Sequence, residues 1–210
     1  MISKNEEALK LISNAIKKAG FVNGRDVSIC LDVAANELFK NNKYAVDSKK
    51  YIPYKNTILF YSKIIKRYKI KSIEDPFAEN DWKSWSELHK KEKKIQIVGD
   101  DLYVTNLQRL KKGFLYQSSN SILIKLNQIG TVSETLDVIR FAQNIGYTTI
   151  ISHRSGDSED TFISDLAVGT NSNQIKTGSL CRSERVAKFN QLLRIEADLI
   201  KSNNMAKLKW

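Results

Sequence analysis

Residues 121–154, "SILIKLNQIGTVSETLDVIRFAQNIGYTTIISHR", contain one complete strand–helix–strand unit, and this unit decides the fold class. Its first and last segments are short apolar runs, whereas the middle segment spaces its apolar residues at a helical period and stops at Gly146. A strand that follows another strand through a helix normally runs parallel to it. The sequence therefore predicts an α/β protein with a parallel sheet.

The same alternation extends over the whole chain of 210 residues. An amphipathic helix over residues 5–20 comes first. Strands are predicted at 27–34, 70–76, 95–101, 121–127, 147–154 and 173–179, and helices at 56–69, 81–93, 104–113, 131–146, 158–170 and 182–200. Units of this kind build (β/α) barrels, whose closed form has eight of them. No Gly/Ser/Pro-rich linker divides the chain, which favours a single domain over residues 1–210.

A polar or charged side chain stands at the carboxyl end of every predicted strand. These residues are Asp32, Glu74, Asp100, Lys125, His153 with Arg154, and Lys176. The first two are 42 residues apart, and the others follow at intervals of 23 to 28 residues, about the length of one βα unit. Active sites of (β/α) barrels form at this end of the strands. We therefore expect these side chains to share one site.

Three of these residues, Asp32, Glu74 and Asp100, are carboxylates that would repel one another if they converged. A hard divalent cation removes that repulsion, and Mg²⁺ suits a few carboxylates together with water and substrate oxygens. The alternative is that each carboxylate is a salt-bridge partner or a helix N-cap. The three together, on successive strands, favour a metal site.

The remaining strand ends are cationic. Lys125 and Lys176 end apolar strands, and a lysine held near other cations and away from water loses its proton more readily, so it can serve as a base. The alternative is a lysine that extends from the rim of the barrel into solvent. Arg154 and Ser155 suit a phosphate or a carboxylate. A site that combines metal ligands, a base and anion-binding residues indicates a reaction that removes a proton next to a carboxylate.

Composition argues against several classes of protein. The net charge of +11 is compatible with nucleic-acid binding, but the lysines are scattered over predicted helix faces and there is no RNP-like aromatic motif or zinc-ligand spacing. No stretch approaches the roughly 20 apolar residues of a membrane span, and the first ten residues do not resemble a signal peptide. Two distant cysteines favour a reducing, cytoplasmic compartment.

Long blocks of the sequence resemble the carboxyl-terminal half of the enolases. The blocks are "LDVAANELF", "SIEDPF", "QIVGDDLYVTN", "LIKLNQIGTVSETL", "SHRSGDSEDTFISDLAVG" and "QIKTGSLCRSERVAKFNQLLRIE", and the resemblance runs from about residue 6 to residue 200. It implies a lyase of glycolysis that dehydrates 2-phosphoglycerate to phosphoenolpyruvate with Mg²⁺. It also implies a cytoplasmic protein and, by family analogy, display at the cell surface.

The resemblance also implies a role for each strand-end residue. Asp32, Glu74 and Asp100 match the family's metal ligands, and Lys125 matches the base that removes the C2 proton. The substrate-binding residues that it implies are Lys125, Arg154, Ser155, Lys176, Glu74 and Asp100. His153 joins Lys125 in the catalytic group with a role left open, and its place beside a helix start is equally compatible with a structural role.

Several parts of the family pattern have no counterpart in this sequence. They are the amino-terminal capping domain, the first barrel strands, the mobile serine loop and the glutamates that deliver a proton to the leaving hydroxyl. We therefore expect residues 1–210 to form an incomplete (β/α) TIM-type barrel of about six βα units, weakly active unless a second chain supplies the missing half. A homodimer is the other assembly that the resemblance implies. Two alternatives stay open: a non-catalytic remnant that binds RNA or protein through its basic surface, and an acid-sugar enzyme of the same superfamily.

Overall fold

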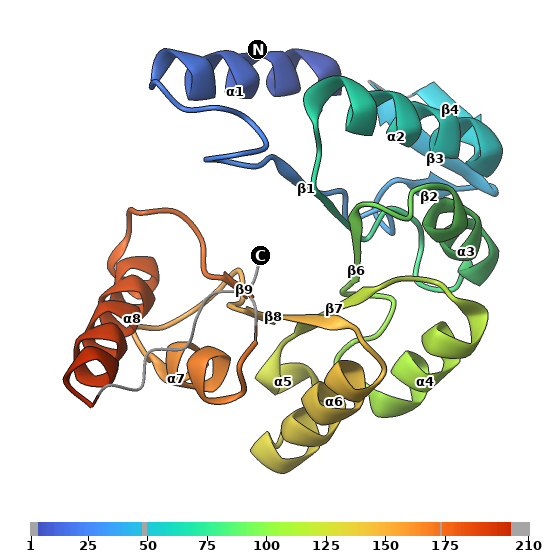
Figure 1. The fold of residues 1–210 in the computed structure, drawn as a ribbon. Helices are drawn as coiled ribbons and strands as arrows, with labels where there is room; N and C mark the ends of the chain where they lie inside the picture. Colours follow the sequence, from blue (N-terminus) through green and yellow to red (C-terminus); the bar gives the residue numbers. More distant parts are fainter. Residues whose placement is uncertain (1–3, 48–49, 173, 203–210) are drawn as a thin grey trace. The chain divides into compact units, whose positions relative to one another are not determined.

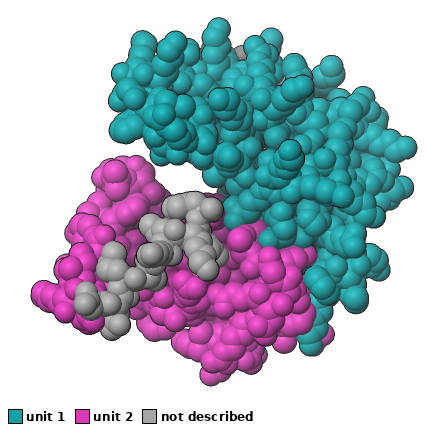
Figure 2. Space-filling model, in the orientation of Figure 1, with its two compact units in different colours: residues 1–103, 111–120 teal, residues 104–110, 121–210 magenta. Residues whose placement is uncertain are grey.

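The computed structural model describes residues 4–47, 50–172 and 174–202. Contacts divide the chain into two compact units: unit 1 comprises residues 1–103 and 111–120, and unit 2 comprises residues 104–110 and 121–210 (Figures 1 and 2). Each unit has its own parallel strands and its own covering helices. The helix α4 (Leu107–Tyr116) belongs to unit 2 as far as Leu110 and to unit 1 from Lys111.

Within its described residues, unit 1 contains three short parallel strands. Its elements are α1 (Asn5–Lys18), β1 (Cys30–Asp32), α2 (Tyr54–Tyr68), β5 (Ser72–Glu74), α3 (Trp82–Lys91) and β6 (Gln96–Gly99). The strand β5 lies between β1 and β6, with Ser72 opposite Cys30 on one side and opposite Gln96 on the other. All three residues of β5 are buried, as is usual for a central parallel strand.

An additional antiparallel sheet separates β1 from α2, and the sequence analysis did not predict it. It consists of β2 (Phe39–Lys40), β3 (Lys43–Asp47) and β4 (Lys50–Pro53). Asn41 and Asn42 form a two-residue turn with φ of +49° and +57°, a conformation that asparagine tolerates and that tight hairpins require. The buried Tyr44 anchors this sheet by donating a hydrogen bond to Asp81 over 2.7 Å. These strands account for the long interval between the first two strand-end residues.

Unit 2 repeats the strand–helix pattern. Its elements are β7 (Ser121–Ile124), α5 (Leu126–Ile129), α6 (Val132–Asn144), β8 (Thr148–Ser152), α7 (Phe162–Gly169), β9 (Gln174–Lys176) and α8 (Ser183–Lys201). The strand β8 pairs in parallel with both β7 and β9. Thr131 caps α6 by accepting a hydrogen bond from the Glu134 N–H, and α6 ends before Gly146, whose φ is +80°.

The predicted fold class is confirmed in both units. Every predicted parallel strand contains an observed one, although the observed strands are shorter, and a helix follows the predicted strands as expected. Asn173, the first residue of the last predicted strand, lies outside the described residues. The short helix α5, directly after Lys125, was not predicted. None of the helices in the described ranges is both long enough and apolar enough to cross a membrane.

The packing of Tyr103 in unit 1 generates a stability prediction. Its ring is fully buried, its hydroxyl lies 2.7 Å from Ser119 Oγ, and a Cβ built on Gly113 would lie 2.3 Å from that hydroxyl. Gly113→Ala should therefore lower the free energy of unfolding by ~1–3 kcal/mol, measured by urea denaturation. The control is Gly169→Ala, also in a helix, where a Cβ meets nothing within 4 Å. Equal stability changes in the two variants would contradict this packing.

Candidate functional site

The carboxylates predicted as metal ligands all lie at the carboxyl ends of the unit 1 strands. Asp32 is the last residue of β1, Glu74 is the last residue of β5, and Asp100 directly follows β6. Asp32 pairs with Glu74, which pairs with Val98, two residues before Asp100. The strand register thus brings these residues to one edge of the sheet, with Glu74 and Asp100 buried and Asp32 exposed.

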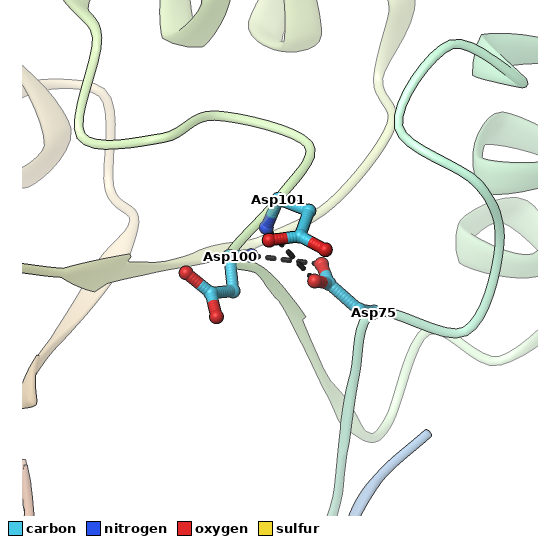
Figure 3. Close-up of side chains that lie close together, drawn as sticks. All are labelled: Asp75, Asp100 and Asp101. Carbon is cyan, nitrogen blue, oxygen red and sulfur yellow. Dashed lines mark hydrogen bonds between the residues drawn. The ribbon is translucent and has the colours of Figure 1, made fainter. Parts of the chain in front are cut away.

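Two further aspartates, which the sequence analysis missed, join Asp100 at this edge. Asp75, Asp100 and Asp101 each present a carboxylate oxygen within 4.8 Å of the others. The Asp75 carboxylate accepts hydrogen bonds from the backbone N–H groups of Asp100, over 2.9 Å, and of Asp101, over 2.8 Å (Figure 3). Asp75 therefore holds the backbone segment that presents Asp100. The doublets "ED" and "DD" in the sequence are the signal that could have identified them.

The surroundings of this cluster disfavour negative charge on Asp75. Burial raises the pKa of Asp75 to about 8, with a further contribution from the two neighbouring aspartates, while the two backbone N–H donors act in the opposite direction. A cation beside these carboxylates would relieve the repulsion. Carboxylate oxygens are hard donors and match Mg²⁺, so the residues present fit the metal that the sequence predicts.

A separate pocket of unit 1 lies beside Asp32 and has a volume of about 240 Å³. Its lining is mainly apolar and includes Leu9, Ile12, Leu31, Leu38, Phe60 and Ile64. An apolar wall offers no hydrogen bonds to a phosphate or carboxylate group. This pocket is therefore a poor site for a charged substrate.

The predicted cationic residues lie together in unit 2. Lys125 directly follows β7 and precedes α5, and its backbone N–H donates to Thr105 Oγ1 over 2.9 Å. Ile124 pairs with Ile151, so Lys125 is level with the next residue of β8, Ser152, which in turn pairs with Lys176. The register therefore places both lysines at the same end of the unit 2 strands.

The loop after β8, residues 153–158, lies beside these lysines. The backbone N–H of His153 donates to the Lys176 carbonyl over 2.9 Å. The Arg154 side chain extends to α5, where it donates to Asn127 Oδ1 over 3.1 Å. Ser155 is exposed in the same loop. We call residues 153–158 the anion loop, because Arg154 and Ser155 are the predicted anion-binding residues.

Two buried cations of α8 anchor the anion loop, and the sequence analysis missed both. Lys188 is 1% exposed and donates to Asp157 Oδ1 over 3.0 Å, to the Glu184 carbonyl over 2.8 Å and to the Ser158 carbonyl. Its three N–H donors are thus all used. Arg185, one turn earlier, is 7% exposed and also reaches the loop.

The pair formed by Asp157 and Lys188 generates the second prediction. Burial pushes the pKa of Asp157 up, but hydrogen bonds from Arg154 N–H, Lys188 and Ser158 N–H outweigh it and leave the pKa below the ordinary 3.8. Asp157→Asn should lower the free energy of unfolding by ~3 kcal/mol at neutral pH, because it leaves a buried ammonium without its carboxylate.

The effect of this variant should depend on pH. Since the unfolded chain binds the proton more readily than the folded one, the contribution of Asp157 is present above pH 3.8 and is lost as the pH falls through the lower folded value. Wild type and Asp157→Asn should therefore converge in acid, which denaturant titrations at several pH values would measure. Asp198→Asn, at a site 80% exposed, is the control. A constant difference down to the lowest pH would contradict the assignment.

Comparison with known proteins identifies the family of the chain. The family model described as "Enolase, C-terminal TIM barrel domain" matches residues 1–209. The chain is 73% identical over 208 residues to the protein named enolase of Pelagibacter ubique (strain HTCC1062), and the match covers 99% of this chain and 50% of that protein. The chain thus spans about half the length of this relative. The predicted resemblance is confirmed: the chain belongs to the enolase family and corresponds to its carboxyl-terminal TIM-barrel domain.

Proposed function

We propose that this chain provides the metal-binding and proton-abstracting part of an enolase, which converts 2-phosphoglycerate to phosphoenolpyruvate. The observation that carries the proposal is the sorting of charge at the strand ends. In unit 1, Asp32 and Glu74 end their strands and Asp100 directly follows β6. In unit 2, Lys125 directly follows β7, Lys176 ends β9, and Arg154 lies in the loop after β8. A substrate with two anionic groups, a carboxylate and a phosphate, needs cationic side chains, and its divalent cation needs carboxylates.

Asp32, Glu74 and Asp100 would hold Mg²⁺ in this proposal, with Asp75 supporting the backbone of Asp100. When bound, the metal supplies positive charge that stabilises the negative charge developing on the substrate carboxylate. Glu74 and Asp100 are buried, which limits their contact with water and strengthens electrostatic interactions at this edge of unit 1.

Lys125 would take the C2 proton, and the cations of unit 2 would hold the substrate. Lys125 follows β7 directly, so its position is set by strand pairing rather than by a long loop. Arg154 and Ser155 would bind the phosphate group, and Lys176 would bind the carboxylate. His153 lies beside them, and its backbone N–H donates a hydrogen bond to the Lys176 carbonyl.

The second half of the reaction requires an acid that protonates the leaving hydroxyl. We place this acid in the part of the relative that the chain does not match, supplied by a second chain. A homodimer is the other assembly consistent with the family. The comparisons lend no support to the alternative of a basic RNA- or protein-binding module.

Magnesium binding tests which carboxylates form the metal site. Mg²⁺ should raise the thermal midpoint of the wild-type chain, by the equivalent of ~2.7 kcal/mol at a concentration 100 times the dissociation constant. Asp32→Asn should reduce this gain. Asp101→Asn is the matched variant, because Asp101 belongs to the aspartate cluster but accepts a hydrogen bond from Asn36 over 2.8 Å. It should retain most of the gain.

The two variants separate two metal sites. If Asp101→Asn abolished the Mg²⁺ effect and Asp32→Asn did not, the metal would belong to the Asp75–Asp100–Asp101 cluster rather than to the strand ends. If Mg²⁺ did not stabilise the wild-type chain, the metal would have to be removed from the proposal.

Enolase activity tests the proposal as a whole. The chain is mixed with the part of the Pelagibacter ubique enolase that it does not match, and formation of phosphoenolpyruvate from 2-phosphoglycerate is followed by absorbance with Mg²⁺ present. We expect turnover in the mixture, reduced by at least ~10² in Lys125→Ala because the general base is lost. Lys201→Ala, at a site 80% exposed, should match the wild type. A mixture in which Lys125→Ala turns over at the wild-type rate would contradict the role of Lys125.

A further inference from the structure

A contact with α8 determines which nitrogen of His153 carries the proton. Arg185 Nη1 lies 2.8 Å from His153 Nδ1. A guanidinium group has only donors and does not lose its proton in proteins, so Nδ1 must be the acceptor and must itself be unprotonated. A neutral imidazole carries one proton, which in His153 therefore lies on Nε2.

The surroundings of His153 favour this neutral form. Burial is the largest cause that lowers the pKa of His153, and the positive charges of Arg185 and Lys176 act in the same direction. A backbone hydrogen bond with Thr177 and the carboxylate of Asp157 act to raise the pKa, but the net direction is downward. Protonation of Nδ1 would also break the hydrogen bond and place two cations against each other.

The same guanidinium holds the backbone of the anion loop. Arg185 donates from Nη1 to the Arg154 carbonyl over 2.9 Å and from Nη2 to the Ser155 carbonyl over 2.8 Å. Gly178, in the loop after β9, packs against this contact. A Cβ at Gly178 would lie 2.8 Å from Arg185 Cδ and 3.2 Å from His153 Cε1, so a glycine is needed there.

We propose that Arg185 is a positioning residue: its guanidinium fixes His153 as the neutral Nε2–H tautomer and holds the backbone of the anion loop in place. His153 is then a hydrogen-bonding group that links this loop to the segment after β9, and not an acid or a base at Nδ1. The use of the loop to grip a substrate anion rests on the proposed function. The tautomer of His153 is a property of the chain without substrate.

The experiment is a nitrogen-15 NMR titration of the histidine rings, recorded without substrate, Mg²⁺ or partner chain, so that its result is independent of enolase activity. The chain has two histidines, and the other, His89, is the internal reference, since its contact is with the Gln117 carbonyl and not with Arg185. In the wild type, His153 should show an unprotonated Nδ1 and a protonated Nε2. In Arg185→Met, the titration midpoint of His153 should shift upward relative to that of His89, and the tautomers should become mixed.

Arg194→Met is the matched control, because Arg194 also lies on α8 and its guanidinium donates to Gln191 Oε1 over 3.3 Å, on the same helix. It should leave both histidines unchanged. A wild-type His153 protonated on Nδ1 would overturn the proposal, whether or not any variant folds. So would an Arg185→Met variant whose His153 keeps the wild-type tautomer and midpoint. Should Arg185→Met fail to fold, Arg185→Gln replaces it, with a raised midpoint as the supporting result and an unchanged midpoint as the contradicting one.

Discussion

Parallel strand pairing is the constraint on which the candidate site depends. A parallel sheet keeps the carboxyl ends of its strands on one edge, so a residue at the end of one strand lies beside the residue at the end of the next. Asp32 is paired with Glu74 in unit 1, and Ser152 is paired with Lys176 in unit 2. A change of one residue in the register would send these side chains to the opposite face of the sheet. The chemistry of each unit therefore rests on backbone hydrogen bonds more than on contacts between the functional side chains.

The sequence predicted those elements in which the hydrophobic pattern along the chain matches the burial of the strand or helix in the fold. The β7–α6–β8 segment was identified because its apolar runs and its helical period are unmistakable, and the strand-end residues were identified with it. The sheet β2–β4 was missed, although Asn41 and Asn42 are suitable hairpin-turn residues and Tyr44 and Val46 alternate with less buried neighbours. Its strands have only two to five residues, and their lysines resemble a solvated loop.

The supporting residues of the site could not be predicted in the same way, because their roles are tertiary. Asp75 has a φ of +42°, which no local pattern indicates, and its carboxylate is directed at a backbone segment 25 residues away along the chain. Arg185 and Lys188 lie on a helix rich in charge, where periodicity assigns charged residues to solvent. Their burial becomes evident only when the loop after β8, with its carbonyl groups and Asp157, is placed against α8.

The arrangement of charge within each unit argues that both units are shaped for a ligand. Unit 1 gathers Asp75, Asp100 and Asp101 within 4.8 Å. In unit 2, Lys125 directly follows β7, Lys176 ends β9, and Arg154 lies in the loop after β8. Like charges brought together oppose folding, and a protein selected for stability alone would intersperse the two signs. The buried Lys188 of α8 has a structural role instead, since all three of its donors are used within the fold. Under the proposed function, a cation bound to unit 1 and an anion bound to unit 2 would each offset repulsion among the like charges beside it and would so stabilise the folded chain.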